Sequence, residues 1–268
     1  MKVRLVVSDV DGTLVDSHKQ LAEATVAAVK RLTDAGIRFT IISARPPSGM
    51  YWIAEKLKLG GLMGAFNGGM LLRADGRIAA QQFVPADLAR DLLALYEKYP
   101  VSRWLFADGE WLATDGHDNH VQREIKSANI QPARNADFSA KLGRVDKLVA
   151  VTDDHDLLCN IEQEALALGK GRATIVRSQV YYLDATAREA NKGAGIERLA
   201  KAFGVSLNET VALGDQANDI AMFRRAGFSV VMGQAGNEVK KEADEVSTSN
   251  DNLGVAHAID HFILKDCL

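Results

Sequence analysis

Two carboxylates follow a short apolar run near the start of the chain, in the stretch D-V-D-G-T at residues 9–13. Strand side chains repeat every two residues, so Asp9 and Asp11 can lean to the same side where the strand ends. Two carboxylates at such a short separation repel each other unless a cation or a shared proton lies between them. Gly12 allows the sharp exit that would leave both exposed above a sheet. An isolated motif of this kind is also typical of a strand that runs into a solvated turn, so its chemistry depends on the residues that join it from later in the chain.

Further residues of the kinds that bind cations and anions come after later apolar segments. They are Ser43, Lys192, Asp215, Asn218 and Asp219. In a parallel sheet, ligands bind beyond the carboxyl ends of the strands, so these side chains are expected at one rim together with Asp9 and Asp11. A lysine at the start of a helix is unfavourable for the helix dipole, which favours a functional role for Lys192.

The elements that must position these residues form a strand–helix–strand pattern. Apolar residues between 21 and 35 recur at helical spacing and end at Gly36, as is typical of a helix C-terminus. The apolar run at 39–42 is expected to be a strand, and this βαβ signature predicts a parallel sheet. Between 83 and 187, short strands mixed with helices predict a compact α+β module. It lies between two halves of one parallel-sheet domain.

The second half continues the pattern. The run at 211–213 predicts a buried strand, Asn218 is expected to cap a helix over 219–226, and a last helix is expected near 253–263. Earlier in the chain, Asn67 and Gly68 stand between two apolar runs, which predicts a hairpin turn.

Composition limits the class of protein. The 268 residues suggest about two domains or one large one, and 47% hydrophobic and 25% charged residues are ordinary for a globular chain. A net charge of −3 gives no nucleic-acid footprint. No apolar stretch of about 18 residues exists, so no membrane span is expected. Cys159 and Cys267 lie far apart in the sequence, which argues against a disulfide scaffold and against a zinc site. No signal-peptide pattern is evident. Together with reduced cysteines, this predicts a cytoplasmic protein.

Taken together, the motifs resemble those of the haloacid dehalogenase (HAD) superfamily of phosphohydrolases. The match consists of D-x-D-G-T at 9–13, Ser43, Lys192 and G-D-x-x-N-D at 214–219. Ser-Ala-Arg stands where relatives often show Thr-Gly-Arg. The stretches at 67–69, 182–184 and 191–193 are similar to the Cof-type subfamily. The resemblance implies a Rossmann-like parallel-sheet core at 1–82 and 188–268, with an inserted α+β cap of the C2 type at 83–187.

The resemblance further implies a Mg²⁺-dependent phosphatase for small phosphate monoesters, with sugar phosphates the leading class. Asp9 would be the nucleophile that forms an aspartyl-phosphate, and Asp11 would protonate the leaving alcohol and then activate water. Mg²⁺ would be held by Asp9, Asp215 and the main-chain carbonyl of Asp11. Lys192 would supply a cation to the phosphoryl oxygens and act in catalysis. The residues expected to bind the phosphate or substrate are Ser43, Ala44, Arg45, Asn67, Lys192 and Asn218.

Several residues have two interpretations at this point. Asp219 would support the lysine, the phosphate or the waters of the metal, or be an ordinary residue of a first helical turn. Arg45 would bind substrate or brace its loop. His117 and His120 are spaced as some metal ligands are, but no third candidate ligand is near them, so they are expected on a solvated surface of the cap. The residues expected in the core are Trp104, Phe106 and Trp111.

Two other functions are compatible with the same motifs. A phosphomutase or phosphotransferase would keep the chemistry and change the acceptor. A receiver-like or other non-catalytic phospho-ligand sensor would also use clustered aspartates, a lysine and Mg²⁺. Such a sensor needs neither an acid–base group at Asp11 nor an inserted module. The expected partner is a small phosphate ester, without nucleic acid or membrane, and monomer and homodimer are both open.

Overall fold

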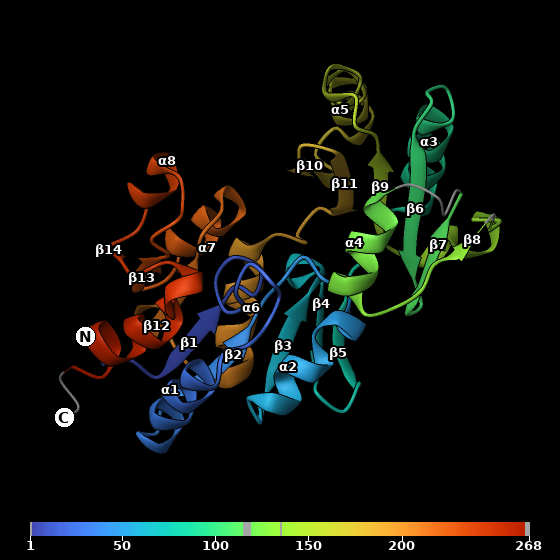
Figure 1. Cartoon of the computed structure of the whole chain (residues 1–268). Coiled ribbons are helices and arrows are strands. Elements are labelled where there is room, and N and C mark those ends of the chain that lie inside the picture. The colour runs from blue at the N-terminus through green and yellow to red at the C-terminus, as the bar shows by residue number, and fades with distance from the viewer. Residues whose placement is uncertain (1, 115–118, 135, 266–268) are drawn as a thin grey trace. The chain divides into compact units, whose positions relative to one another are not determined.

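Residues 2–114, 119–134 and 136–265 are described by the computed structural model, and packing divides the chain into two units (Figure 1). The first, which we call the core unit, consists of Met1–Ala44, Tyr51–Ala79 and Asn191–Leu268. The second, the inserted unit, consists of Arg45–Met50 and Ala80–Ala190. The predicted boundaries of the cap domain, between residues 82 and 83 and between residues 187 and 188, stay a prediction.

The core unit is built on the strands β1 (Leu5–Ser8), β2 (Arg38–Ile41), β12 (Thr210–Gly214), β13 (Phe228–Val231) and β14 (Glu245–Val246). They form one sheet in the order β14-β13-β12-β1-β2, and each neighbouring pair is parallel. Its helices are α1 (Glu23–Asp34), α2 (Tyr51–Lys56), α6 (Lys192–Phe203), α7 (Ile220–Phe223), α8 (Asn237–Lys240) and α9 (Gly254–Ala258). A smaller sheet has the order β3 (Leu62–Ala65), β4 (Met70–Arg73), β5 (Ile78–Gln81), and the boundary between the two units falls within β5, after Ala79.

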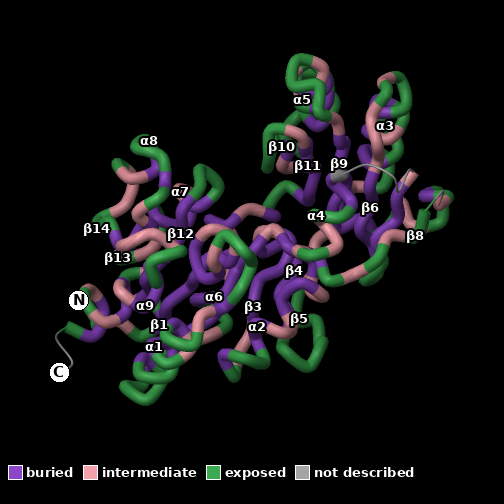
Figure 2. Tube along the Cα trace, viewed as in Figure 1, coloured by how far each residue is buried: buried purple, intermediate pink, exposed green. Residues whose placement is uncertain are grey.

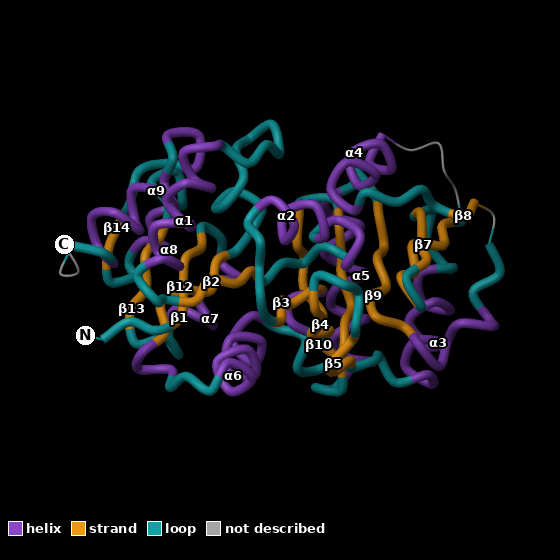
Figure 3. The backbone as a smooth tube through the Cα atoms, turned by 90° about the horizontal axis from the view of Figure 1, so that it is seen from below, coloured by secondary structure: helices purple, strands orange, loops and turns teal. Residues whose placement is uncertain are grey.

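The parallel sheet is buried on both faces, which explains why its strands read as continuous apolar runs. All residues of β1 and β12 are buried (Figure 2). Leu199 of α6 and Phe223 of α7 pack into the cluster on one face, and α1 and α9 lie on the opposite side from α6 (Figure 3). Leu5 of β1 is in register with Arg38 of β2 and with Thr210 of β12. The residues directly after these three strands therefore share one edge.

Two helices differ from the sequence prediction. Asn218 does not cap a helix over 219–226, because it lies inside a 3₁₀ turn, Ala217–Asp219, whose N-cap is Gln216, and α7 has only four residues. The carboxylate of Asp219 accepts the main-chain N–H groups at this turn, so no side-chain cap from Asn218 is needed. The expected last helix is divided into α9 and a π-helical turn, Ile259–Ile263.

The inserted unit contains a second sheet. Its strands are β6 (Ser102–Ala107), β7 (Glu110–Ala113), β8 (Ala133–Arg134), β9 (Val145–Val151), β10 (Ala173–Gln179) and β11 (Tyr182–Ala187). The order is β10-β11-β9-β6-β7-β8, antiparallel except for the pair β7–β8. The helices are α3 (Ala86–Tyr96), α4 (Asn119–Ala128) and α5 (His155–Gly169). The predicted mixed α/β fold, with a parallel core sheet and a separate cap sheet, is confirmed.

The core of the inserted unit lies between its sheet and the pair α3 and α5. Leu92 of α3 and Ile161 of α5 join Leu148 of β9 in one buried cluster. Trp104, Phe106 and Trp111 are buried as predicted, each at most 2% exposed, although none of them belongs to this cluster. In the part of the chain that the structure describes, no helix is both long and apolar enough to cross a membrane.

The prediction of a solvated His120 is wrong, because this residue is only 5% exposed. Its Nε2 lies 2.8 Å from Oδ1 of Asp153, and its ring stacks on Tyr181 with 4.2 Å between the centroids. A carboxylate partner and an aromatic face offset the cost of burying an imidazole. Both partners are distant in sequence, so local spacing gave no sign of them. His117 lies outside the described residues.

Asp146, in β9, is a carboxyl group buried in the inserted unit. It is 3% exposed, and its Oδ1 accepts a hydrogen bond of 2.7 Å from Nε2 of Gln81. Its Oδ2 is buried and has no hydrogen-bond partner among the described residues. Burial raises the pKa of this carboxyl to about 7.

Asp146→Asn is expected to change how stability depends on pH. Because the pKa of Asp146 is about 7 in the folded state and about 3.9 in an unfolded chain, the folded state binds the proton more tightly. Ionisation therefore lowers the free energy of unfolding as the pH rises from about 4 to about 7. The variant should match the wild type near pH 4 and exceed it by up to about 4 kcal/mol above pH 7. Urea unfolding across this range measures it, and a difference that does not change with pH would contradict it.

Candidate active site

Asp9 comes directly after β1, and Asp215 directly after the neighbouring strand β12. The main-chain N–H of Asp9 donates to the carbonyl of Leu213 at 2.8 Å, so the strands stay paired up to the edge where the carboxylates emerge. Asp9 is 4% exposed and Asp215 is 2% exposed. The parallel register thus brings together two residues that are more than 200 positions apart in the sequence.

Three carboxylates, those of Asp9, Asp215 and Asp219, meet at this edge. One oxygen from each lies within 4.8 Å of the others, and no other group of three acidic, histidine or cysteine ligands occurs among the described residues. Nζ of Lys192 lies 2.6 Å from Oδ1 of Asp9 and also donates to Oδ1 of Asp219. One ammonium charge against three carboxylates leaves an excess of negative charge in a nearly dry environment.

The helix α6 positions Lys192 as its first residue. Asn191 caps this helix, since its side-chain oxygen accepts the N–H of Ala194 at 3.0 Å. Burial by itself lowers the pKa of the Lys192 ammonium, but the charges of Asp219 and Asp9 outweigh it and hold that pKa above its usual range. The lysine therefore stays charged although it is only 2% exposed.

Asp219 fixes both the loop and the lysine. Its Oδ2 accepts the main-chain N–H groups of Asp215 and Gln216, each at 2.9 Å, while its Oδ1 accepts from Lys192. Gly214 makes room for this carboxylate, because a Cβ at residue 214 would lie 2.5 Å from Cγ of Asp219. Of the two interpretations of Asp219, the structure favours a support for Lys192 and for the loop that carries Asp215.

Two residues that sequence reasoning missed hold Asp215. The hydroxyl of Thr13 donates to Oδ1 of Asp215 at 2.9 Å, and Nε2 of Gln216 donates to Oδ2 at 3.0 Å. Gly12, with a φ of +82°, passes so close that a Cβ would lie 2.4 Å from Oδ2 of Asp215. Thr13 closes the D-x-D-G-T motif, so its presence there was a signal that could have been used. Nothing in the sequence singled out Gln216.

The electrostatics of the carboxylates fit a divalent cation. Burial raises the pKa of Asp9 well above its usual range; Lys192 opposes this rise, and Asp219 and Asp215 add to it. Burial also raises the pKa of Asp215, and the charge of Asp219 adds to that shift. Hard divalent cations take carboxylate oxygens as ligands, and such a charge would offset the repulsion that these shifts express.

The side chain of Asp11 is not part of this group of three. Its Oδ1 lies 2.7 Å from Nζ of Lys19, which stands in the next turn of the chain. The residue directly after Asp11 is held by Gln234, whose Nε2 donates to the carbonyl of Gly12 at 2.5 Å. The chain around Asp11 is therefore anchored to a loop from the second half of the core unit.

Ser43 and Asn67 are neighbours in the core unit. Ser43 is 1% exposed, and its main-chain carbonyl accepts the N–H of Asn67 at 2.7 Å. Asn67 adopts a left-handed conformation, with φ 57° and ψ 29°, in the turn between β3 and β4. Its Oδ1 is buried without a hydrogen-bond partner among the described residues. A buried acceptor in this state calls for a donor such as a hydroxyl group or a water molecule.

Two glycines allow this turn to approach α6. A Cβ on Gly68, whose φ is +86°, would lie 2.7 Å from Cα of Gly195. Arg198, also in α6, donates to the carbonyl of Gly68. The contact brings Asn67 close to the helix that begins with Lys192.

Three further predicted site residues lie in three different settings. Ala44 is half-buried and ends the first segment of that unit. Arg45 belongs to the inserted unit, where its Nη1 donates to the carbonyl of Gly49 at 3.0 Å. Asn218 is exposed. Their roles in binding substrate stay predictions.

Comparisons with known proteins agree with this geometry. A family model described as haloacid dehalogenase-like hydrolase matches residues 6–259. A protein of Haemophilus influenzae that is named as a phosphatase is 31% identical over 262 residues, which cover 96% of this chain and 97% of the relative.

Two further relatives extend the comparison. The 5-amino-6-(5-phospho-D-ribitylamino)uracil phosphatase of Bacillus subtilis is 25% identical, over 98% of this chain and 96% of its own. The crystal structure of a haloacid dehalogenase-like hydrolase from Bacteroides thetaiotaomicron aligns with a TM-score of 0.89 and 28% identity, over 98% of this chain and 100% of the other. The family match and the phosphatase relatives lead to one conclusion: the chain belongs to the haloacid dehalogenase-like hydrolases, and within them it is a phosphatase.

Proposed function

We propose that this phosphatase hydrolyses small organic phosphate monoesters, sugar phosphates first among them, through an aspartyl-phosphate on Asp9 and with Mg²⁺ as cofactor. The observation that carries the proposal is the buried contact of Lys192 with Asp9 inside a group of three carboxylates. A carboxylate can attack a phosphate dianion only where positive charge offsets the repulsion between them. This arrangement combines a fixed ammonium with oxygen atoms suited to a divalent cation.

In the first step, a carboxylate oxygen of Asp9 forms a bond to phosphorus, and the bond between phosphorus and the ester oxygen breaks. The protonated form of Asp11, released from its contact with Lys19, gives its proton to the departing alcohol. In the second step, water attacks phosphorus, Asp11 takes a proton from that water, and the Asp9 carboxylate leaves. Inorganic phosphate and the alcohol are the products, and both aspartates return to their starting state.

The residues that would hold the cation are Asp9, Asp215 and the main-chain carbonyl of Asp11. One oxygen of Asp9 and one of Asp215 lie within 4.8 Å of each other, and carboxylate oxygens are the ligands that Mg²⁺ prefers. When bound, Mg²⁺ supplies Lewis-acid stabilisation of the negative charge on the phosphoryl oxygens. Lys192 opposes the rise in the pKa of Asp9 and orients its carboxylate, and Thr13 and Gln216 hold Asp215 in place.

Small, hydroxyl-rich phosphate esters are the proposed substrates. The Bacillus subtilis relative is named for a phosphorylated ribitylamino compound, and the unsatisfied Oδ1 of Asn67 would accept a hydrogen bond from a substrate hydroxyl. We assign phosphate or substrate binding to Ser43, Ala44, Arg45, Asn67, Lys192 and Asn218.

A turnover assay tests the proposed function. With Mg²⁺, the protein is expected to release inorganic phosphate and free sugar in equal amounts from several hexose and pentose phosphates. Chelation with EDTA should remove this activity, and added Mg²⁺ should restore it. Transfer of the phosphoryl group to a second sugar without free phosphate would instead identify a phosphomutase or phosphotransferase. Full activity in EDTA would exclude the metal role.

A further inference from the structure

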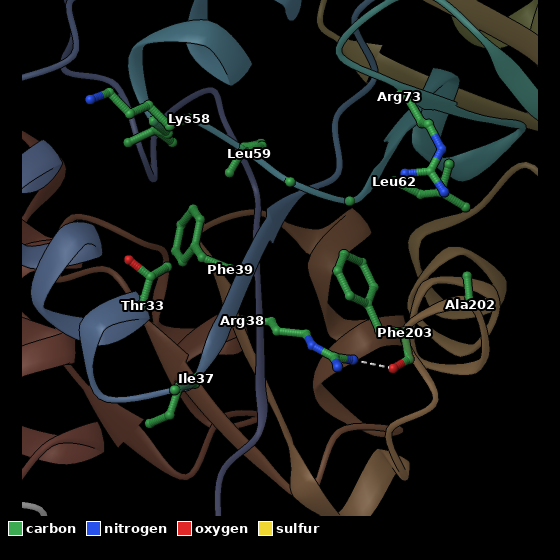
Figure 4. Close-up of a pocket in the computed structure, with 14 residues that line it drawn as sticks. Thr33, Ile37, Arg38, Phe39, Lys58, Leu59, Leu62, Arg73, Ala202 and Phe203 are labelled. Atoms are coloured by element: carbon green, nitrogen blue, oxygen red, sulfur yellow. Dashed lines mark hydrogen bonds between the residues drawn. The ribbon is translucent and has the colours of Figure 1, made fainter.

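A cavity of about 600 Å³ lies in the core unit at the amino end of β2, and we call it the amino-edge cavity (Figure 4). Arg38, the first residue of β2, lines it and is in register with Leu5 of β1. Asp9 lies four residues beyond Leu5, which corresponds to roughly 13 Å along the strand. The cavity is therefore separate from the proposed catalytic site. Its volume is in the range of about 300–1,000 Å³ that small-molecule sites occupy.

The walls of the amino-edge cavity are largely apolar. The apolar side chains that line it include Phe39, Leu57, Leu59, Leu62 and Phe203. The rings of Phe39 and Phe203 lie on either side of Arg38 (Figure 4). Gly61 forms part of the wall with its backbone, and a Cβ there would lie 2.3 Å from Cζ of Phe203. This glycine therefore lets the Phe203 ring pack directly against the chain.

The charges that line the cavity are all positive. They belong to Arg38, Lys58 and Arg73, and none of the described residues that line it is acidic. Nη1 of Arg38 donates to the main-chain oxygen of Phe203, and its guanidinium lies 5.9 Å from the centroid of that ring. This contact fixes the guanidinium and leaves its remaining N–H groups for a ligand.

The three cationic side chains of the cavity point in different directions. Arg73 extends toward Leu62 from the wall opposite Arg38, whereas the ammonium of Lys58 points away from the two rings (Figure 4). Among the described residues, neither Arg38 nor Arg73 forms a salt bridge within 4.0 Å, and Arg73 lies near enough to Asp75 for its charge to contribute to lowering the pKa of that carboxyl. Guanidinium groups bind phosphate-like oxygens with paired N–H donors, and two of them match a dianion better than a single negative charge.

We propose that the amino-edge cavity binds a small organic dianion of the phosphate class with a flat apolar body. The anionic group would contact both Arg38 and Arg73, and the body would lie against Phe203 and the neighbouring leucines. This would be a second binding site, independent of the catalytic function proposed above.

Phenylphosphonate, a dianion that has no ester bond to hydrolyse, is a suitable probe for the full-length protein. Titration followed by ¹H–¹⁵N NMR should shift the amide signals of Gly60 and Gly61 in a saturable way. Gly12 and Gly214 pack against Asp215 and Asp219, so their amide signals report separately on the carboxylate cluster. Benzamide, which has the flat body without the charge, should bind at least about tenfold more weakly, because charge-assisted hydrogen bonds are roughly twice as strong as neutral ones.

Arg73→Gln is the decisive variant, because it removes a cavity cation without touching the Phe203 contact made by Arg38. We expect it to weaken phenylphosphonate binding at the Gly61 signal about tenfold, the effect of one charge-assisted hydrogen bond. Arg38→Gln should weaken binding at least as much. Arg224→Gln, which removes the same charge from an exposed pair with Glu242, is the matched control and should bind as the wild type does. Equal affinity in all four proteins, or no saturable shift at Gly60 and Gly61, would overturn the proposal.

Discussion

Asp9→Asn is expected to slow the hydrolysis of p-nitrophenyl phosphate on the order of 10⁴-fold or more, as loss of a catalytic nucleophile does in other enzymes. An amide oxygen is a far weaker nucleophile than a carboxylate, so the aspartyl-phosphate would not form. Initial rates of nitrophenolate release at saturating Mg²⁺ measure the effect. Asp34→Asn, at an exposed carboxylate that pairs with Lys30, is the matched control and should keep wild-type rates.

The same variant should fold at least as stably as the wild type. Burial raises the pKa of Asp9, so ionised Asp9 costs folding free energy at neutral pH, and a neutral asparagine removes this cost. The thermal midpoint in EDTA is therefore expected to be equal or higher. A lost activity together with a lost fold would leave the nucleophile assignment without support, and normal turnover would refute it.

Lys192→Met should affect both activity and stability. The lysine is the only ammonium in direct hydrogen-bond contact with Asp9 and Asp219 among the described residues. Removing one member of a buried charged group costs about 3–5 kcal/mol, because the partners keep their burial and lose their compensation. We also expect kcat/KM to fall by about two to three orders of magnitude, the effect of losing one preorganised donor to a developing charge.

Urea unfolding in EDTA measures the stability change of Lys192→Met. The deficit should shrink in acid, because the carboxyl groups left without the lysine then take up protons and lose their charge. Lys30→Met removes an exposed lysine that pairs with Asp34, and such surface pairs contribute about 0–1 kcal/mol. If the two variants lost the same stability, Lys192 would not be the charge that holds the carboxylates together.

The general position of the site was predictable because it depends on rules of strand geometry. Residues after β1, β2 and β12 share an edge because parallel strands end together, and Asp9, Ser43 and Asp215 each come after such a strand. The left-handed turn at Asn67 was likewise predictable, since an Asn-Gly pair between apolar runs favours it. Each of these patterns involves only a few consecutive residues, so it can be recognised in the sequence.

Other features depend on contacts that spacing does not encode. Asp219 stands where a first-turn residue would, yet it accepts from the distant Lys192 as well as from its own loop. His120 reads as a surface residue because the partners that bury it, Asp153 and Tyr181, come from other elements. The assignment of Arg45 to the inserted unit has the same cause, because packing and not sequence continuity decides it.

That assignment has a consequence for engineering by module exchange. The backbone passes from one unit to the other four times, after Ala44, Met50, Ala79 and Ala190. Within the segment 45–50, Ser48 contacts the end of α4, where its hydroxyl donates to the carbonyl of Ala128 at 2.5 Å. A chimera that took only residues 80–190 from a relative would place this protein's own segment 45–50 against the α4 of the relative. We therefore expect a working chimera to take residues 45–50 from the same relative as well.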